Sequence, residues 1–393
     1  MLDIVISIAK ISPHRLPALD GLRALSIALV LLAHTAGTIG APHLGIPHQT
    51  GFLGVRIFFV ISGFLITTLL MSERRRTGRI AVGDFYLRRV FRIFPAFYVF
   101  LAVVLVLAAA QLVELHRGDA LFAATYTMNY HQGRAWIVGH LWSLSVEEQF
   151  YLLWPAILVL VGTRRATWFA IAAVAAAPLL RVGIWSLVPA LRPYIEESFP
   201  TVFDAIATGC VMAAVRGRLI ATPGYRRLMG SRLFFLVPLA GLGASMVSRL
   251  WFDLALGQSI TNVAIALTVD WCVRHPSGAV GRVLESRPMV WIGTLSYSIY
   301  LWQQLFLDRH GTSLINVFPL NVGLALAAAA LSYHAVERPS LMLRVRLFGR
   351  PRRPSAVVQE AAPPPDVLEP ALPARVVLAP SAATSSSMLP RMQ

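Results

Sequence analysis

Ten stretches of about 20 mostly apolar residues constrain this chain more than any other feature of its sequence. Each is long enough to cross the roughly 30 Å hydrocarbon core of a bilayer as an α-helix. The apolar residues AVILMFWYC make up 56% of the 393 positions and charged residues only 14%. This composition excludes a water-soluble globular protein and a disordered chain. It predicts an all-α polytopic membrane protein with about ten transmembrane helices. The expected spans are 20–38, 52–71, 93–113, 138–161, 167–189, 199–215, 233–249, 251–273, 289–307 and 317–336.

Basic residues are unevenly divided between the two sides of these spans. If the N-terminus is cytoplasmic, the inward segments hold 27 of the 35 Lys and Arg residues and the outward segments hold five. Because short cytoplasmic loops are enriched in Lys and Arg, we expect both termini in the cytoplasm and the protein in the cell's inner (cytoplasmic) membrane. This topology also explains the net charge of +16, so membrane lipid is an expected partner and nucleic acid is not.

The composition changes along the chain and predicts three parts. Residues 1–15 are expected to form a cytoplasmic N-terminal segment and residues 16–348 a transmembrane domain. Residues 349–393 are rich in Pro, Ala, Ser and Arg, and predict a disordered cytoplasmic tail. The two cysteines, Cys210 and Cys272, lie in apolar stretches without metal-ligand spacing, so neither a disulfide nor a metal site is expected.

Two ionisable residues of the first span, Arg23 and His34, lie eleven positions apart. At 100° per residue they share one face of a helix, about 16 Å apart along its axis. Ionisable side chains inside a membrane are costly and are functional candidates by default. Snorkelling of Arg23 to headgroups and a hydrogen bond from His34 to a neighbouring helix would explain them equally well.

The fourth span carries a polar stripe, formed by His140, Ser143, Glu147 and Tyr151 at helical spacing. Counting residues from the two membrane surfaces places Glu147 within a few Å of the depth of His34. A carboxylate and an imidazole at matched depth can act as a general-base pair. We therefore predict that His34 and Glu147 are catalytic, with Glu147 orienting His34. A buried ion pair that only joins two helices is the alternative.

Arg89 and Arg92 lie at positions i and i+3 where the third span enters from the cytoplasm. The planar fork of a guanidinium group suits phosphate oxygens. Together with Arg23, which is near the same mouth, this pair predicts a binding site for a phosphorylated cofactor. Anchoring by positive charge alone would be the simpler explanation, but both arginines lie among Phe, Tyr and Pro.

Six strings of the sequence resemble, in order, those of the acyltransferase 3 family of integral-membrane acyltransferases. They are LDGLRALSIALVLLAH, GVRIFFVISGFLIT, FYLRRVFRIFPAF, HLWSLSVEEQFYLLWP, WIGTLSYSIYLWQ and SYHAVERPS. The resemblance implies an enzyme that transfers an acyl group, often acetyl, from acyl-CoA to a hydroxyl of a carbohydrate-containing acceptor, such as a surface polysaccharide or glycolipid. It also implies that Arg23 and His34 are essential, that Arg89 and Arg92 form the family's RxxR motif, and that Glu147 is its fourth-span glutamate.

Three features depart from the family pattern. Gln303 stands where many members have His, so no catalytic role is expected there. Asp204 is present in the sixth span, but the Arg that often precedes it is absent. The sequence also lacks the soluble esterase-like domain fused to some members, so the membrane part is expected to handle the acceptor.

Other functions fit parts of the same pattern. The acceptor could be a small glycosylated metabolite of the macrolide kind. Intramembrane Arg, His and Glu would also suit a proton-coupled transporter, although no inverted repeat is visible. A non-catalytic scaffold would leave the shared face of Arg23 and His34 unexplained. Hydroxyls that could stabilise a transition-state oxyanion are Ser143, Ser145, Tyr151 and Tyr300, and the sequence does not choose among them. The oligomeric state also stays open.

Overall fold

The computed structural model describes residues 16–43, 45–47 and 49–349. Every regular element within these ranges is a helix, so the all-α prediction is confirmed there. The expected N-terminal segment and the tail from residue 350 onward lie outside the described residues.

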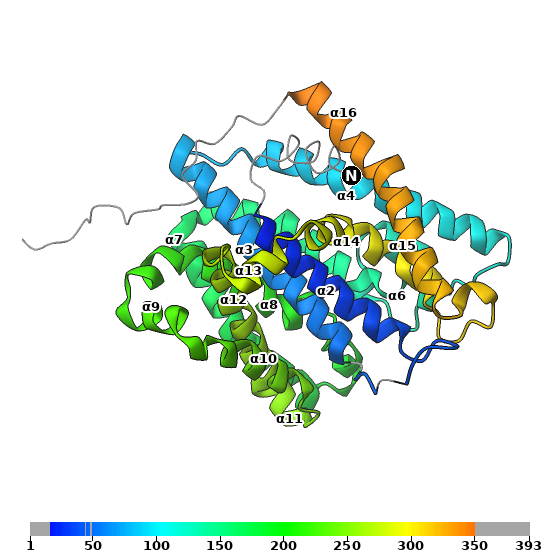
Figure 1. Ribbon diagram of the computed structural model, residues 1–393, viewed down its shortest axis with the longest axis horizontal. Helices are drawn as coiled ribbons and strands as arrows, with labels where there is room; N and C mark the ends of the chain where they lie inside the picture. The colour runs from blue at the N-terminus through cyan, green and yellow to red at the C-terminus, as the bar shows by residue number, and fades with distance from the viewer. Residues whose placement is uncertain (1–15, 44, 48, 350–393) are drawn as a thin grey trace, which may run out of the picture.

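The longer helices form one bundle in which neighbours in space are often distant in sequence. In Figure 1, α2 and α3 run side by side through the middle of the bundle, and α14 lies against α2. α8 packs on both α3 and α7, and α12 packs on α10 and α8. The longer helices are α2 (Pro17–Thr35), α3 (Gln49–Thr77), α4 (Val82–Ala109), α7 (Leu141–Leu187), α8 (Phe199–Ala221), α10 (Leu236–Met246), α12 (Gln258–Arg274), α14 (Arg287–Phe306), α15 (Leu320–Ser332) and α16 (Arg338–Phe348).

Shorter helical elements connect these. They are α5 (Asp119–Ala124), α6 (Trp136–Gly139), α9 (Pro223–Gly230), α11 (Leu250–Phe252), α13 (Ala279–Leu284), the 3₁₀ turns η1 (Met128–Tyr130), η2 (Pro189–Tyr194), η3 (Arg232–Phe235) and η5 (Leu314–Asn316), and the π-helical turns η4 (Asp253–Gly257) and η6 (Tyr333–Glu337). The two π turns join α11 to α12 and α15 to α16 without a break in the helical path, so each joined pair is long enough to cross a membrane.

Seven helices in the described part are long and apolar enough to cross a membrane, or eight if the bent pair Pro223–Gly230 and Arg232–Met246 is one span. The sequence predicted about ten. Two of the ten, 138–161 and 167–189, fall on one continuous stretch, Trp136–Leu187. Another of the ten predicted spans, 289–307, overlaps α14. The Ser, Thr and Gln side chains of this helix lower its mean hydropathy below that of the seven candidate helices.

The stretch Trp136–Leu187 has a break in its middle. Its 52 residues would be about 78 Å long as one straight helix, more than twice the hydrocarbon core. Gly162 has φ 79° and ψ 163°, a conformation outside the helical region that glycine adopts without strain. The helical path is therefore kinked at Gly162, between the two predicted spans.

Close contact between α3 and α8 depends on two glycines. The string SGF at residues 62–64 predicts a tight helix contact, since a small residue lets backbones approach. A Cβ at Gly63 would lie 2.0 Å from the carbonyl oxygen of Ile206, and one at Gly209 would lie 2.1 Å from that of Val60. The prediction of close packing at Gly63 is therefore confirmed.

We expect Gly63→Ala to destabilise the bundle by about 1–3 kcal/mol, since the added methyl group forces α3 and α8 apart. Gly217→Ala is the matched control, because a Cβ at Gly217 of α8 has no atom within 4 Å. Thermal unfolding of the two purified variants in detergent measures the difference. Equal unfolding temperatures would contradict the prediction.

Candidate active site

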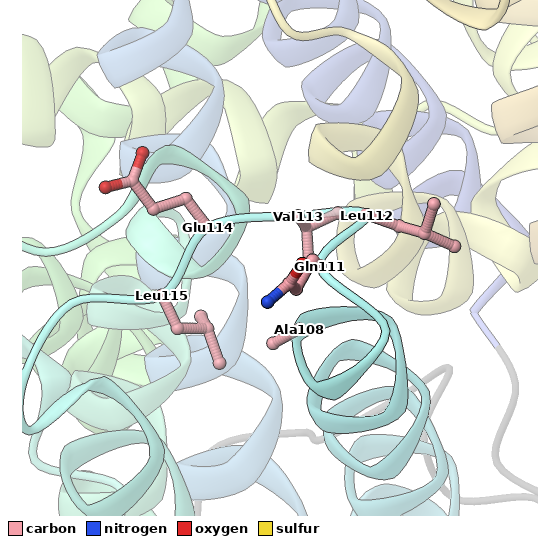
Figure 2. A pocket seen from close by; sticks show the side chains of 6 residues that line it. All are labelled: Ala108, Gln111, Leu112, Val113, Glu114 and Leu115. Atoms are coloured by element: carbon pink, nitrogen blue, oxygen red, sulfur yellow. The ribbon is translucent and has the colours of Figure 1, made fainter.

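Two hollows, one at the surface and one between helices, have different lining residues. One, of about 470 Å³, lies beyond the end of α4 and is formed by the single segment 108–115 (Figure 2). Its one charged side chain, Glu114, is 86% exposed and pairs with the neighbouring His116. A surface hollow of this kind brings no distant residues together. In the described part of the chain, no group of three or more His, Cys, Asp or Glu could hold a metal ion.

The second is a cavity of about 80 Å³ lined by residues of α2, α3, α4, α7 and α14. It contains four of the five predicted site residues: Arg23, Arg89, Arg92 and Glu147. The other polar lining residues are Ser62, Ser143, Glu148, Tyr151, Ser296, Tyr297 and Tyr300, and the apolar ones are Val55, Phe58, Phe59, Ile93 and Leu144. Five helices thus place three guanidinium groups and two carboxylates around one chamber.

The arginines reach this cavity from two helices. Arg89 and Arg92 lie one turn apart on α4, and Arg23 comes from α2, where Asp20 is 3.7 Å away. The Arg89 guanidinium carbon lies over the Tyr151 ring at 4.6 Å from its centroid, which holds the planar group against the cavity wall. Three such groups in one chamber can bind an anion with several oxygens, such as a phosphate.

Glu147 is held within the same cavity. Ser62 donates a hydrogen bond to its Oε1 at 2.7 Å, and the Tyr151 hydroxyl approaches its Oε2 at 3.5 Å and Ser62 Oγ at 3.2 Å. Ser62 therefore serves as a donor to Glu147. Sequence reasoning missed Glu148, which also lines the cavity. It is about 100° around the helix from Glu147, and both side chains contact the cavity.

His34 lies on α2 one position before the helix ends. Its Nδ1 is 2.8 Å from Oε1 of Gln303 on α14, and its ring meets that of Trp136 edge-on. The structure therefore gives His34 a Gln303 partner and places Glu147 with Ser62 and the arginines. The sequence predicted that these two side chains would pair, but His34 and Glu147 contact different partners.

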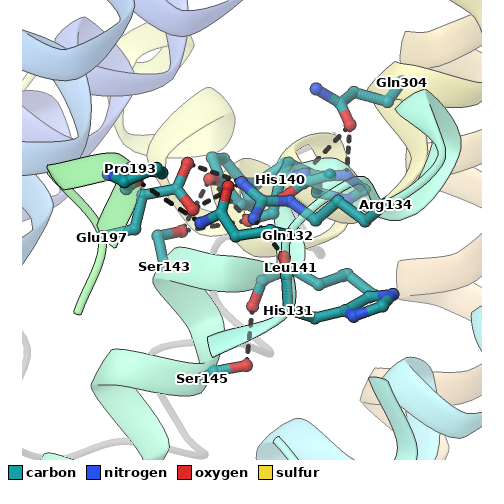
Figure 3. A network of polar contacts seen from close by, with 12 residues as sticks. His131, Gln132, Arg134, His140, Leu141, Ser143, Ser145, Pro193, Glu197 and Gln304 are labelled. Atoms are coloured by element: carbon teal, nitrogen blue, oxygen red, sulfur yellow. Dashed lines mark hydrogen bonds and ion pairs between the residues drawn. The ribbon is translucent and has the colours of Figure 1, made fainter. Parts of the chain in front are cut away.

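A path of hydrogen-bonded polar groups leads from the cavity to Gln304 of α14. Ser143 Oγ and the Tyr300 hydroxyl are 2.6 Å apart, and that hydroxyl donates to the carbonyl oxygen of His140 at 3.0 Å. Nδ1 of the buried His140 lies 2.8 Å from Oε1 of Gln304, the residue next to Gln303 (Figure 3). The predicted polar stripe of the fourth span is thus one side of this path.

Two connecting segments, 131–139 and 188–198, meet beside His140. Arg134 Nη2 donates to both carboxylate oxygens of Glu197, at 2.5 and 2.6 Å (Figure 3). The same side chain donates to the carbonyl oxygens of His131 and Gly139. Burial raises the pKa of Glu197, and its bond to Arg134 opposes that rise. The ion pair holds segment 131–139 against segment 188–198, next to His140.

Asp204 has an arginine partner that the sequence pattern did not suggest. Arg181 of α7 donates from Nη1 to Asp204 Oδ2 at 2.9 Å, and both side chains are fully buried. The arginine missing from the sixth span is therefore supplied by another helix. On α3, Arg56 donates to Oδ1 of Asn262 on α12 at 3.3 Å.

The sequence of this chain matches a known protein family. The family described as "Acyltransferase domain" matches residues 16–333, which is most of the chain. The chain belongs to this acyltransferase family. The predicted family resemblance is thereby confirmed.

Relatives of this acyltransferase-family chain include two bacterial proteins. It is 30% identical to "O-acetyltransferase OatA" of Staphylococcus aureus over 368 residues, which cover 84% of this chain and 57% of that protein. It is 27% identical to "Peptidoglycan O-acetyltransferase OatA" of Listeria monocytogenes over 372 residues, or 84% of this chain and 56% of that protein. The chain thus spans little more than half the length of these relatives. Among solved structures, none matches it significantly.

Proposed function

We propose that this protein is an O-acyltransferase of the cell's inner membrane that moves an acyl group, acetyl in the first instance, from cytoplasmic acyl-CoA to a hydroxyl of a carbohydrate-containing acceptor. The observation that carries the proposal is the cavity that gathers Arg23, Arg89, Arg92 and Glu147. Family membership and the names of the relatives support acyl transfer to a carbohydrate.

The proposed topology has ten spans and both termini in the cytoplasm. It counts Trp136–Leu187 as two crossings and adds α14 and the bent pair Pro223–Gly230 and Arg232–Met246. The break at Gly162 and the concentration of 27 of 35 basic residues on one side support it. Residues 16–348 then form the catalytic domain, flanked by cytoplasmic segments. This topology opens the arginine cavity toward cytoplasmic acyl-CoA.

In the proposed reaction, the arginines bind the phosphates of acyl-CoA. Its flexible arm spans the distance between Arg23 and His34, about 16 Å along the helix axis. His34 removes the proton of the acceptor hydroxyl, and the hydroxyl oxygen attacks the thioester carbonyl carbon. The C–S bond then breaks, and the CoA thiolate takes the proton from the imidazolium. The products are the acyl ester and free CoA.

Residues of the cavity supply the electrostatic environment for this step. We assign Glu147 to the catalytic set as the carboxylate that balances the arginines and holds Ser62 and Tyr151 in place. Ser143 and Tyr300 line the cavity, where Tyr300 donates its hydroxyl hydrogen to the carbonyl oxygen of His140. To donate to the thioester oxygen, either hydroxyl would exchange its present hydrogen bond for one to the substrate. Ser145 is bonded instead to Leu141 and to the Met128 backbone N–H.

We expect Arg89→Gln and Arg92→Gln each to raise KM for acyl-CoA by roughly 10- to 100-fold, because a hydrogen bond to a charged group contributes about 1.5–3 kcal/mol. Arg75→Gln serves as the control, since Arg75 is exposed at the end of α3 and bonds only the nearby Ser72 in the described structure. Initial rates at varied acyl-CoA concentration measure the effect. An unchanged KM in both cavity variants would remove the arginines from the donor site.

The proposal is tested with the full chain purified into lipid nanodiscs. Acetyl-CoA is supplied with either a peptidoglycan-type oligosaccharide or a small glycoside, and products are analysed by mass spectrometry together with CoA release. We expect an acetyl mass increment on the oligosaccharide. An increment on the glycoside alone would replace the acceptor class. Proton-coupled uptake into liposomes without CoA release would overturn acyl transfer in favour of transport.

A further inference from the structure

Two consecutive glutamines of α14 each contact a different histidine. Oε1 of Gln303 lies 2.8 Å from Nδ1 of His34, and Oε1 of Gln304 lies 2.8 Å from Nδ1 of His140. Gln304 also accepts the backbone N–H of His140, whose other ring nitrogen lies 3.0 Å from the carbonyl oxygen of Leu301. His140 is therefore bonded at both ring nitrogens and joins α7 to α14. His34 contacts the other glutamine, Gln303.

The contact with Gln303 determines which nitrogen of His34 carries hydrogen. An amide oxygen can only accept a hydrogen bond, so Nδ1 is the protonated nitrogen. In the neutral ring the lone pair then lies on Nε2. A general base needs its lone pair on a defined nitrogen that faces the proton to be removed. The amide oxygen of Gln303, on α14, determines in this way that the lone pair of His34 is on Nε2.

The burial of Gln303 shows that this contact has a cost. The residue is 0% exposed, and its Nε2 has no hydrogen-bond partner in the described part of the chain. A buried donor without a partner destabilises the folded state. Leucine would fill similar space without that cost, but it would offer His34 no acceptor. Glutamate would offer one, but it would add a charge to a buried position.

We infer that Gln303 is a positioning residue for the proposed acyl transfer: its side-chain oxygen holds the Nδ1 proton of His34 and so directs the basic Nε2 toward the acceptor hydroxyl. This inference rests on the proposed function of His34. We predicted from the sequence that Glu147 orients His34, and the inference assigns this role to Gln303.

Kinetics of three Gln303 variants in nanodiscs test this. Gln303→Leu removes the acceptor for Nδ1 and is expected to lower kcat about 10²-fold with little change in KM for acyl-CoA, as a misoriented or wrongly protonated base does. Gln303→Glu keeps an oxygen at this position and is expected to stay within about tenfold of wild-type kcat. If the Leu variant does not fold, Gln303→Asn withdraws the amide by one methylene and gives the same comparison.

Nitrogen NMR of histidine-labelled protein provides a readout that does not depend on acyl transfer. The His34 signals, assigned by comparison with His34→Asn, are expected to show a protonated Nδ1 in wild type and to lose that preference in Gln303→Leu. If wild type shows no acyl transfer, the proposed function fails while this spectrum still decides the inference. A protonated Nε2 in wild type overturns it.

Gln304→Leu is the matched control on the same helix, since Gln304 contacts His140 instead. It is expected to lower thermal stability while leaving the His34 spectrum unchanged. A purely structural Gln303 would behave in the same way: the Leu variant would unfold earlier, and the folded protein would keep wild-type kcat. That result would overturn the inference.

Discussion

His34→Ala is expected to lower the rate of acyl transfer by about 10²- to 10⁴-fold, the usual contribution of a positioned general base. Its imidazole is the group at the end of α2 that can take the acceptor proton, and Gln303 holds its Nδ1 at 2.8 Å. The arginines lie at the other end of the path, so KM for acyl-CoA should change little. Initial rates of acetyl transfer in nanodiscs, normalised to folded protein, measure both quantities.

His310→Ala is the control for this experiment. His310 is an exposed residue in the loop after α14, where its backbone N–H bonds Asp308. We expect wild-type rates from this variant. If His34→Ala kept more than about a tenth of wild-type turnover, a general-base role for His34 would be untenable.

Arg181→Met is expected to destabilise the protein by about 3–5 kcal/mol, because it leaves Asp204 as an uncompensated charge in the bundle. Both side chains are fully buried, and the second oxygen of Asp204 has no hydrogen-bond partner among the described residues. The double variant Arg181→Met with Asp204→Leu should recover much of the loss, since an apolar pair replaces the ion pair at little net cost. Thermal unfolding and abundance in the membrane measure the series.

Arg192→Met controls for the loss of one positive charge. Arg192 is exposed, and its side chain donates to the carbonyl oxygen of Trp185. Its replacement should change stability by no more than about 0.5 kcal/mol. A single Arg181→Met variant as stable as wild type would show that Asp204 finds another partner.

Site residues that share one helix were predictable as a group because helical spacing alone brings them together. Arg89 and Arg92 are one turn apart, and the stripe through Ser143, Glu147 and Tyr151 faces one way on any α-helix. Such periodicity needs no knowledge of neighbouring helices. Glu148 was missed because the same spacing places it off the stripe, and the packing of the neighbouring helices brings it into the cavity lining.

The relative depth in the membrane of two side chains on different helices is harder to predict from the sequence. An error of three residues in where a span begins moves a side chain by about 4.5 Å along the axis, more than the length of a hydrogen bond. The predicted pairing of Glu147 with His34 depended on two such boundaries. The structure places Glu147 with Ser62, and His34 with Gln303.

The sequence by itself determined that the chain is an all-helical, multi-pass membrane protein and which residues line one face of each helix. These properties follow from composition and from the 3.6-residue period, which are local. Only the tertiary structure decided which helix supplies each partner: Arg181 for Asp204, Gln303 for His34 and Gln304 for His140. The physical reason is that these contacts join residues 23 to 269 positions apart, and their geometry depends on how whole helices pack.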